Sequence, residues 1–197
     1  MGRCRYCSTP ISVRYPLIEL FTASLFVLEY YIYINSHTFS LEIVPLLAFV
    51  GILFGQAVID FETQLLPFGA SLSGMAIGLI YAFLRKPWWE FFIAAAAGFI
   101  IIGAIGLIGK IIYKKDAMGG GDLVFAAFLG SFLGIQNLII GLFFGIMLSG
   151  LFAIGLLLFT EKTRKDEFAL GPFLALGGFL AQPELGLGEL TKRLFGF

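Results

Sequence analysis

Residues 90–113 read EFFIAAAAGFIIIGAIGLIGKIIY, a stretch whose charged residues are Glu90 at its start and Lys110 near its end. Folded as an α-helix, this stretch would be about 36 Å long, because each residue adds about 1.5 Å. The hydrocarbon core of a bilayer is about 30 Å thick, and about 20 apolar residues cross it as a helix. The stretch therefore predicts a membrane-spanning helix.

The rest of the chain has the same apolar character. Hydrophobic residues make up 59% of its 197 residues, charged residues make up 13%, and the mean hydropathy is +0.95. Thirteen basic and thirteen acidic residues cancel, so no excess charge would keep the chain in water or attract a nucleic acid. The 25 Gly residues suit membrane helices, because small residues let helix backbones approach closely. The composition excludes a soluble enzyme and a nucleic-acid-binding protein, and it predicts an all-α polytopic integral membrane protein.

Seven apolar runs, separated by charges, prolines or polar clusters, divide the sequence. They cover residues 17–34, 41–59, 66–84, 90–113, 123–134, 136–159 and 168–182. The second, third, fourth and sixth are long enough to span a membrane, and the first is adequate although it contains Glu19 and Glu29. The fifth and seventh are short, which leaves a tilted, partial or re-entrant helix open. We expect six or seven transmembrane helices in one domain, residues 17–197, after a short cytoplasmic arm, residues 1–16.

The Lys and Arg residues of the short loops predict the orientation, because cytoplasmic loops carry an excess of them. With the N-terminus in the cytoplasm, the inner segments hold nine: Arg3, Arg5, Arg14, Lys110, Lys114, Lys115, Lys162, Arg164 and Lys165. The outer segments hold four: Arg85, Lys86, Lys192 and Arg193. A cytoplasmic N-terminus is therefore favoured. In that topology the second run ends, at Asp60, on the same cytoplasmic face on which the fifth begins, at Asp122.

These two carboxylates, Asp60 and Asp122, are the candidate catalytic groups. Charges in membrane spans are costly, and those that persist usually face a cavity or a partner. Two adjacent carboxylates can share one proton, so that the ionised one activates a water and the neutral one polarises a peptide carbonyl. Gly119 and Gly121 would let a substrate backbone approach, because they lack side chains. This is aspartyl-protease chemistry, while a helix cap and an ion- or proton-coupled transporter are alternatives that the spacing leaves open.

Several motifs resemble those of type IV prepilin peptidases, a family of GxGD intramembrane aspartyl proteases. In chain order they are CRYC (4–7), RYPLIE (14–19), DFETQLLP (60–67), MGGGD (118–122) and GPFLALGG (171–178). The third and fourth match the family's two aspartate motifs, so the resemblance implies that Asp60 and Asp122 are catalytic. It further implies an endopeptidase of the bacterial inner membrane, which cleaves the leader of prepilins or pseudopilins after a Gly at the cytoplasmic face. The domain 17–197 is then a transmembrane aspartyl protease domain.

The cysteine pair bears on cofactors. Typical members of the family begin with a further helix and carry two CxxC pairs, whereas this chain starts near what resembles the second pair, Cys4 and Cys7. We therefore expect a member that lacks the first helix and the first pair. A closed zinc site needs four ligands, so zinc is implied at these cysteines only together with that other pair. The peptidase reaction requires no cofactor, and S-adenosylmethionine is implied only if the family's N-methylation of the mature pilin is retained.

Other residues bear on the substrate. Phe68 stands where the family usually has Asp or Asn, and Val124 stands where it commonly has Lys, which implies an altered substrate preference. Glu19 is expected either to bind the substrate's N-terminus or to pair with Arg14, and Glu62 to attract a basic leader. The expected partners are a prepilin or pseudopilin and membrane lipid, with no nucleic acid. A small coupled transporter and a non-catalytic scaffold of a pilus or secretion assembly are the alternative hypotheses.

Overall fold

A computed structural model describes the greater part of the chain: residues 2, 5–10, 12–36, 40–114, 119–159 and 169–185. The helices are α1 (Arg14–Ser36), α2 (Ile43–Thr63), α3 (Phe68–Ala82), α4 (Trp88–Tyr113), α5 (Gly120–Phe159) and α6 (Gly171–Leu180), followed by the short 3-10 helix η1 (Pro183–Leu185). Within these described ranges there is no β-strand. The prediction of an all-α protein is confirmed.

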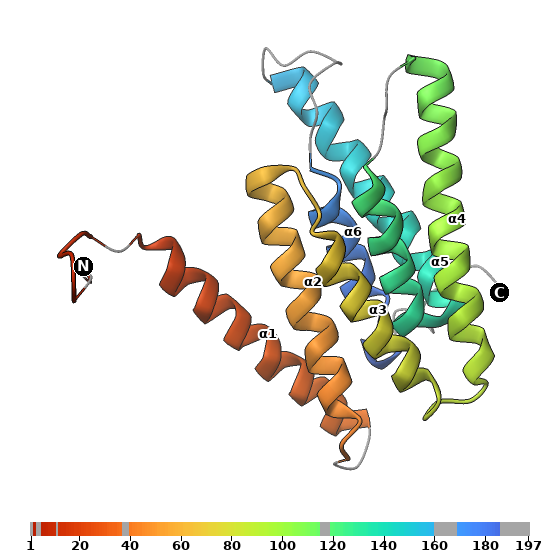
Figure 1. The fold of residues 1–197 in the computed structure, drawn as a ribbon, viewed down its shortest axis with the longest axis horizontal. Coiled ribbons are helices and arrows are strands. Elements are labelled where there is room, and N and C mark those ends of the chain that lie inside the picture. Colours follow the sequence, from red (N-terminus) through yellow and green to blue (C-terminus); the bar gives the residue numbers. More distant parts are fainter. Residues whose placement is uncertain are drawn as a thin grey trace.

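α5 consists of two helical segments, because Gly134 lies at φ 74° and ψ 173°. This conformation is open almost only to glycine. The chain reverses there, so that residues 135–159 return beside residues 120–133 (Figure 1). The carboxylate of Glu90, in the first turn of α4, accepts a hydrogen bond of 3.3 Å from the Ile135 N–H and so caps the returning segment. The fifth and sixth apolar runs of the sequence correspond to these two segments.

Four helical stretches are long and apolar enough to cross a membrane, which confirms a polytopic membrane protein. They are Arg14–Asn35, Ile43–Thr63, Trp88–Ile112 and Gly120–Gly155. The expectation that the third apolar run forms a span of full length is wrong, because α3 has 15 residues and is only about 22 Å long. The first two residues of this run, Leu66 and Pro67, precede the helix, and its last two, Phe83 and Leu84, follow it. Leu66 lies outside the helix because a residue that precedes proline is disfavoured in the helical conformation.

An aromatic cluster lies at the centre of the bundle, between α2, α3 and α5. The ring of Phe49 lies 5.3 Å from that of Phe128 and 4.7 Å from that of Phe132. Gly74 of α3 faces Phe128, and a Cβ built on it would lie 2.7 Å from the ring. The small residues of α3 thus let it pack directly onto the aromatic face of α5.

Small residues also set the contacts of α4 and α6 with α5. Gly130 of α5 faces the carbonyl of Ala94 in α4 so closely that a side chain would not fit. Gly145 of α5 faces the backbone of α6, where a Cβ would lie 2.9 Å from the Phe173 carbonyl oxygen. Because the backbones approach this closely, α6 is held in a fixed position against α2 and α5.

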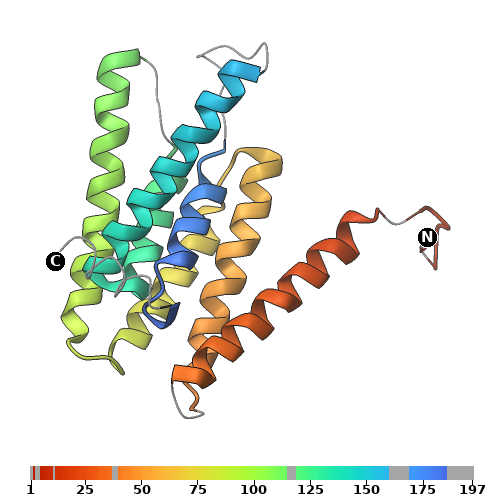
Figure 2. The same ribbon diagram turned by 180° about the vertical axis from the view of Figure 1, so that it is seen from behind.

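α1 is the least embedded of the long helices. Figures 1 and 2 show its N-terminal half diverging from α2. Only 11% of the most apolar part of Arg14–Asn35 is buried. Its C-terminal half is anchored by Glu29, whose side chain is fully buried. In the amide orientation that satisfies both groups, Gln182 donates to the two carboxylate oxygens of Glu29 at 2.9 and 3.1 Å. This contact ties α1 to the segment that follows α6.

Candidate active site

The fold brings Asp60 and Asp122 to the same end of the bundle. Asp60 lies in the last turn of α2, and Asp122 lies in the first turn of α5. The start of α5 packs against the loop that follows α2, where a Cβ on Gly121 would lie only 2.7 Å from the carbonyl oxygen of Leu66. Asp60 and Asp122 thus lie beside the contact between the end of α2 and the start of α5. Residues far apart in the sequence therefore form one acidic pair.

Asp60 is held by the N-terminus of α6. Its side chain is only 4% exposed, and its Oδ2 accepts a hydrogen bond of 2.8 Å from the backbone N–H of Gly171. A helix N-terminus favours a negative charge, because its first N–H groups are unpaired and the helix dipole is positive there. A Cβ on Gly171 would lie 2.6 Å from Oδ2, so any larger residue here would displace the Asp60 carboxylate.

Gly171 is the residue that sequence reasoning missed. The GPFLALGG motif contained it, but no property of that motif indicated a contact with Asp60. One available signal was the glycine–proline pair at a helix start, since proline is favoured in the first turn and glycine permits a close approach.

Asp122 is partly buried and is held by its own turn. Its Oδ2 accepts a hydrogen bond of 3.0 Å from the Gly119 N–H, and its backbone N–H donates to the Gly119 carbonyl at 3.2 Å. A carboxylate in the first turn of a helix is stabilised by the helix dipole. Asp122 therefore caps the start of α5, as the helix-cap alternative expected. The bond from the Gly119 N–H also fixes the direction in which the Asp122 carboxylate points.

The glycines beside Asp122 differ in their surroundings. Gly119 and Gly120 are exposed, and a Cβ on Gly120 would meet nothing within 4 Å. Gly121 is instead packed against Leu66. Room for an approaching peptide thus lies beside Gly119 and Gly120, whereas internal packing accounts for the glycine at position 121.

The acidic residues expected to meet the substrate lie on the surface. Glu62 is exposed two residues after Asp60, and its Oε1 lies 3.5 Å from Nη1 of Arg14. Glu19 is exposed on α1. The structure pairs Arg14 with Glu62 rather than with Glu19, because residues five apart on a helix do not share a face as residues three or four apart do.

The two cysteines by themselves supply only part of a closed zinc site. Cys4 lies outside the described residues, and Cys7 is exposed with its Sγ 3.0 Å from the Thr9 hydroxyl. In the part of the chain that the structure describes, no group of three or more His, Cys, Asp or Glu side chains is placed to hold a metal ion. Two thiolates supply half of a closed tetrahedral site, so no step is assigned to zinc.

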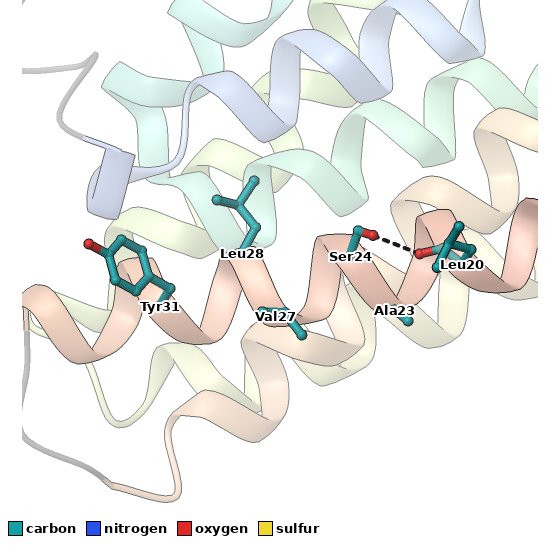
Figure 3. A pocket seen from close by; sticks show the side chains of 6 residues that line it. All are labelled: Leu20, Ala23, Ser24, Val27, Leu28 and Tyr31. Carbon is teal, nitrogen blue, oxygen red and sulfur yellow. Dashed lines mark hydrogen bonds between the residues drawn. The ribbon is translucent and has the colours of Figure 1, made fainter.

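A hollow of about 550 Å³ lies along α1 (Figure 3). It is lined by Leu20, Ala23, Ser24, Val27, Leu28 and Tyr31. The Ser24 hydroxyl donates to the Leu20 carbonyl at 2.8 Å, within its own helix. S-adenosylmethionine carries charged amino and carboxylate groups, and burying such groups requires polar partners. This apolar hollow therefore does not fit that cofactor, and no step is assigned to it.

Residues 46–154 match the type IV leader peptidase family, and residues 1–33 match the bacterial peptidase A24 N-terminal domain. The chain therefore belongs to the type IV leader peptidase family, which confirms the resemblance seen in the sequence. No solved structure matches the chain significantly.

The curated relatives are bacterial proteins named prepilin leader peptidase/N-methyltransferase. The chain is 33% identical to the one from Myxococcus xanthus, covering 98% of this chain and 58% of the relative. It is 33% identical to the one from Aeromonas salmonicida (91% and 61%) and 30% identical to the one from Bacillus subtilis (91% and 70%). The chain thus spans about three fifths of the first two. None of these similarities supports the transporter hypothesis.

Proposed function

We propose that the protein is a membrane-embedded aspartyl endopeptidase that cleaves the leader peptide of type IV prepilins or pseudopilins. One observation carries the proposal: Asp60 and Asp122, from different helices, form a single pair at one end of the bundle. Membership of the leader peptidase family supports it, as do the names of the relatives.

The pair supplies the groups that peptide hydrolysis needs. One ionised aspartate accepts a proton from water, whose oxygen bonds to the scissile carbonyl carbon, while the protonated aspartate donates to the carbonyl oxygen. Collapse of the tetrahedral species breaks the C–N bond, and the leaving nitrogen takes up a proton. The N–H groups of Gly171 and Gly119 hold Asp60 and Asp122 in fixed directions during these steps. Such positioning lowers the barrier because the reacting groups start in place.

The proposed location is the bacterial inner membrane, with the aspartate pair at the cytoplasmic face. The excess of basic residues on the inner segments supports this orientation. At the other end of the bundle, Trp88 and Trp89 are exposed at the start of α4, as suits an aromatic belt at a membrane interface. In this orientation Gly119 and Gly120, rather than the packed Gly121, form the side along which the substrate lies, and Glu62 and Glu19 attract the positive charges of a leader.

Purified protein incubated with a prepilin in detergent, followed by mass spectrometry, tests the proposal. The expected product begins at the residue after the leader glycine. Asp60→Asn and Asp122→Asn should each lower kcat/KM by at least about 10³-fold, as loss of a catalytic side chain does. Glu42→Gln is the matched control, because it changes a carboxylate at the opposite end of α2.

Circular dichroism and thermal unfolding establish that each variant is folded. Wild-type cleavage in a folded Asp→Asn variant would refute the proposed roles, and no cleavage by the wild-type protein would refute the activity. The mass spectra of the cleavage product also test N-methylation, which would make the product about 14 Da heavier.

A further inference from the structure

Gln56 is a buried polar residue one helical turn before Asp60. Its side chain is 1% exposed, and it lies on the buried stripe of α2 that also contains Leu53 and Asp60. Its Oε1 accepts a hydrogen bond of 2.7 Å from the hydroxyl of Ser71 in α3, which is itself fully buried. This bond fixes the oxygen side of the amide toward α3, and the NH₂ side is therefore directed elsewhere.

The Gln56 amide nitrogen has no hydrogen-bond partner among the described residues, although it is buried. A buried N–H without a partner is costly, and native proteins contain few of them. Ser71 accounts for the acceptor of this amide but leaves the donor without a function. Apart from Asp60, the other buried residues of α2, such as Leu53, are apolar.

Asp60 carries the nearest side-chain acceptor on the buried stripe of α2. Its Oδ2 is occupied by Gly171, whereas its Oδ1 receives none of the hydrogen bonds found within the described ranges. Gln and Asp four residues apart on a helix are neighbours that form side-chain hydrogen bonds. Gln56 and Asp60 have this spacing and share a face of α2.

We infer that Gln56 is a positioning residue of the aspartate pair, whose side-chain NH₂ donates to the Asp60 carboxylate in the reacting arrangement. The Gly171 N–H then holds Oδ2 of Asp60 and the Gln56 NH₂ holds Oδ1. With both oxygens held, the carboxylate cannot rotate while water is deprotonated. Ser71 orients Gln56 in turn. This inference rests on the proposed peptidase function, and it adds a residue that none of the sequence motifs contains.

The kinetic parameters of two variants test the inference. Gln56→Met removes the donor and keeps a side chain of similar length, and we expect kcat to fall about tenfold to a hundredfold, as for a lost hydrogen bond to a charged group. KM for the prepilin should stay within about twofold, because Gln56 is buried away from the surface that the substrate reaches. Ser71→Ala breaks the bond between α2 and α3 but keeps the amide, so it should lower kcat by less than Gln56→Met does.

A purely structural role of Gln56 predicts a different pattern. In that case Ser71→Ala and Gln56→Met would lower activity and melting temperature equally, which would overturn the inference. A kcat of Gln56→Met within about threefold of wild type, or a loss confined to KM, would also overturn it. Should Gln56→Met fail to fold, Gln56→Leu also removes the donor from this buried position, and the same criteria apply. Failure of the wild-type protein to cleave prepilin would instead refute the proposed function itself.

Discussion

The contact between Gly171 and Asp60 gives the sharpest quantitative prediction. In Gly171→Ala the new Cβ would lie 2.6 Å from Oδ2 of Asp60, whereas an ordinary contact is about 3.4 Å or more. The two groups must therefore separate by about 0.8 Å. This shift would lengthen the present hydrogen bond of 2.8 Å to about 3.6 Å, a distance at which it is no longer a hydrogen bond.

Loss of a hydrogen bond to a charged group amounts to about 1.5–3 kcal/mol, or about tenfold to 150-fold in rate. We expect kcat/KM of Gly171→Ala for prepilin cleavage to fall by that factor. Gly55→Ala is the matched control, because Gly55 lies in α2 near Asp60 and its Cβ would meet nothing within 4 Å. The substitution there should leave activity unchanged and stabilise the helix slightly.

Detergent-solubilised enzyme, a prepilin substrate and thermal unfolding suffice for this measurement. A folded Gly171→Ala variant with wild-type kcat/KM would show that the bond to Asp60 has no role in positioning. An equal loss in Gly55→Ala would show that any added methyl group in this region impairs the enzyme.

Two further predictions concern the surroundings of the pair. Gly121→Ala places a Cβ 2.7 Å from the Leu66 carbonyl oxygen, so it should lower both activity and stability. In a denaturation assay the free energy of unfolding should fall by about 1–3 kcal/mol, as overpacking does. Gly120→Ala is the control and should not lower stability in this way, because its Cβ would meet nothing within 4 Å. Glu62→Gln breaks an exposed ion pair with Arg14, so unfolding should change by less than about 1 kcal/mol, whereas KM for a basic leader should rise. An unchanged KM would exclude Glu62 from substrate attraction.

Much of the fold was predictable from the sequence because hydropathy is a local property. All seven apolar runs became a helix or one segment of α5, and Gly134 separates the fifth run from the sixth. The prediction was wrong about the length of α3, because Pro67 takes Leu66 out of the helix and the helix ends at Ala82, two residues before the end of the run. Hydropathy counts Leu66 as part of the run, whereas the backbone restriction of proline decides where the helix begins.

The candidate site was predictable to the extent that charge is scarce in this chain. Asp60 and Asp122 were identifiable because a carboxylate at the end of an apolar run has few reasons to be there. Their partners were not identifiable in this way. Gly171 and Gln56 are an ordinary glycine and an ordinary amide until the positions of α6 and α3 are known.

The sequence by itself determined that this protein is a bundle of membrane helices with two carboxylates at helix ends, because composition and the positions of charges at the ends of apolar runs are sufficient for both conclusions. Only the tertiary structure decided what holds those carboxylates. The start of α6 meets the end of α2, so that a backbone N–H reaches Asp60, and Leu66 leaves no space for a side chain at Gly121. These contacts join residues that are distant in the chain, and their distances follow from how the helices pack rather than from any local pattern.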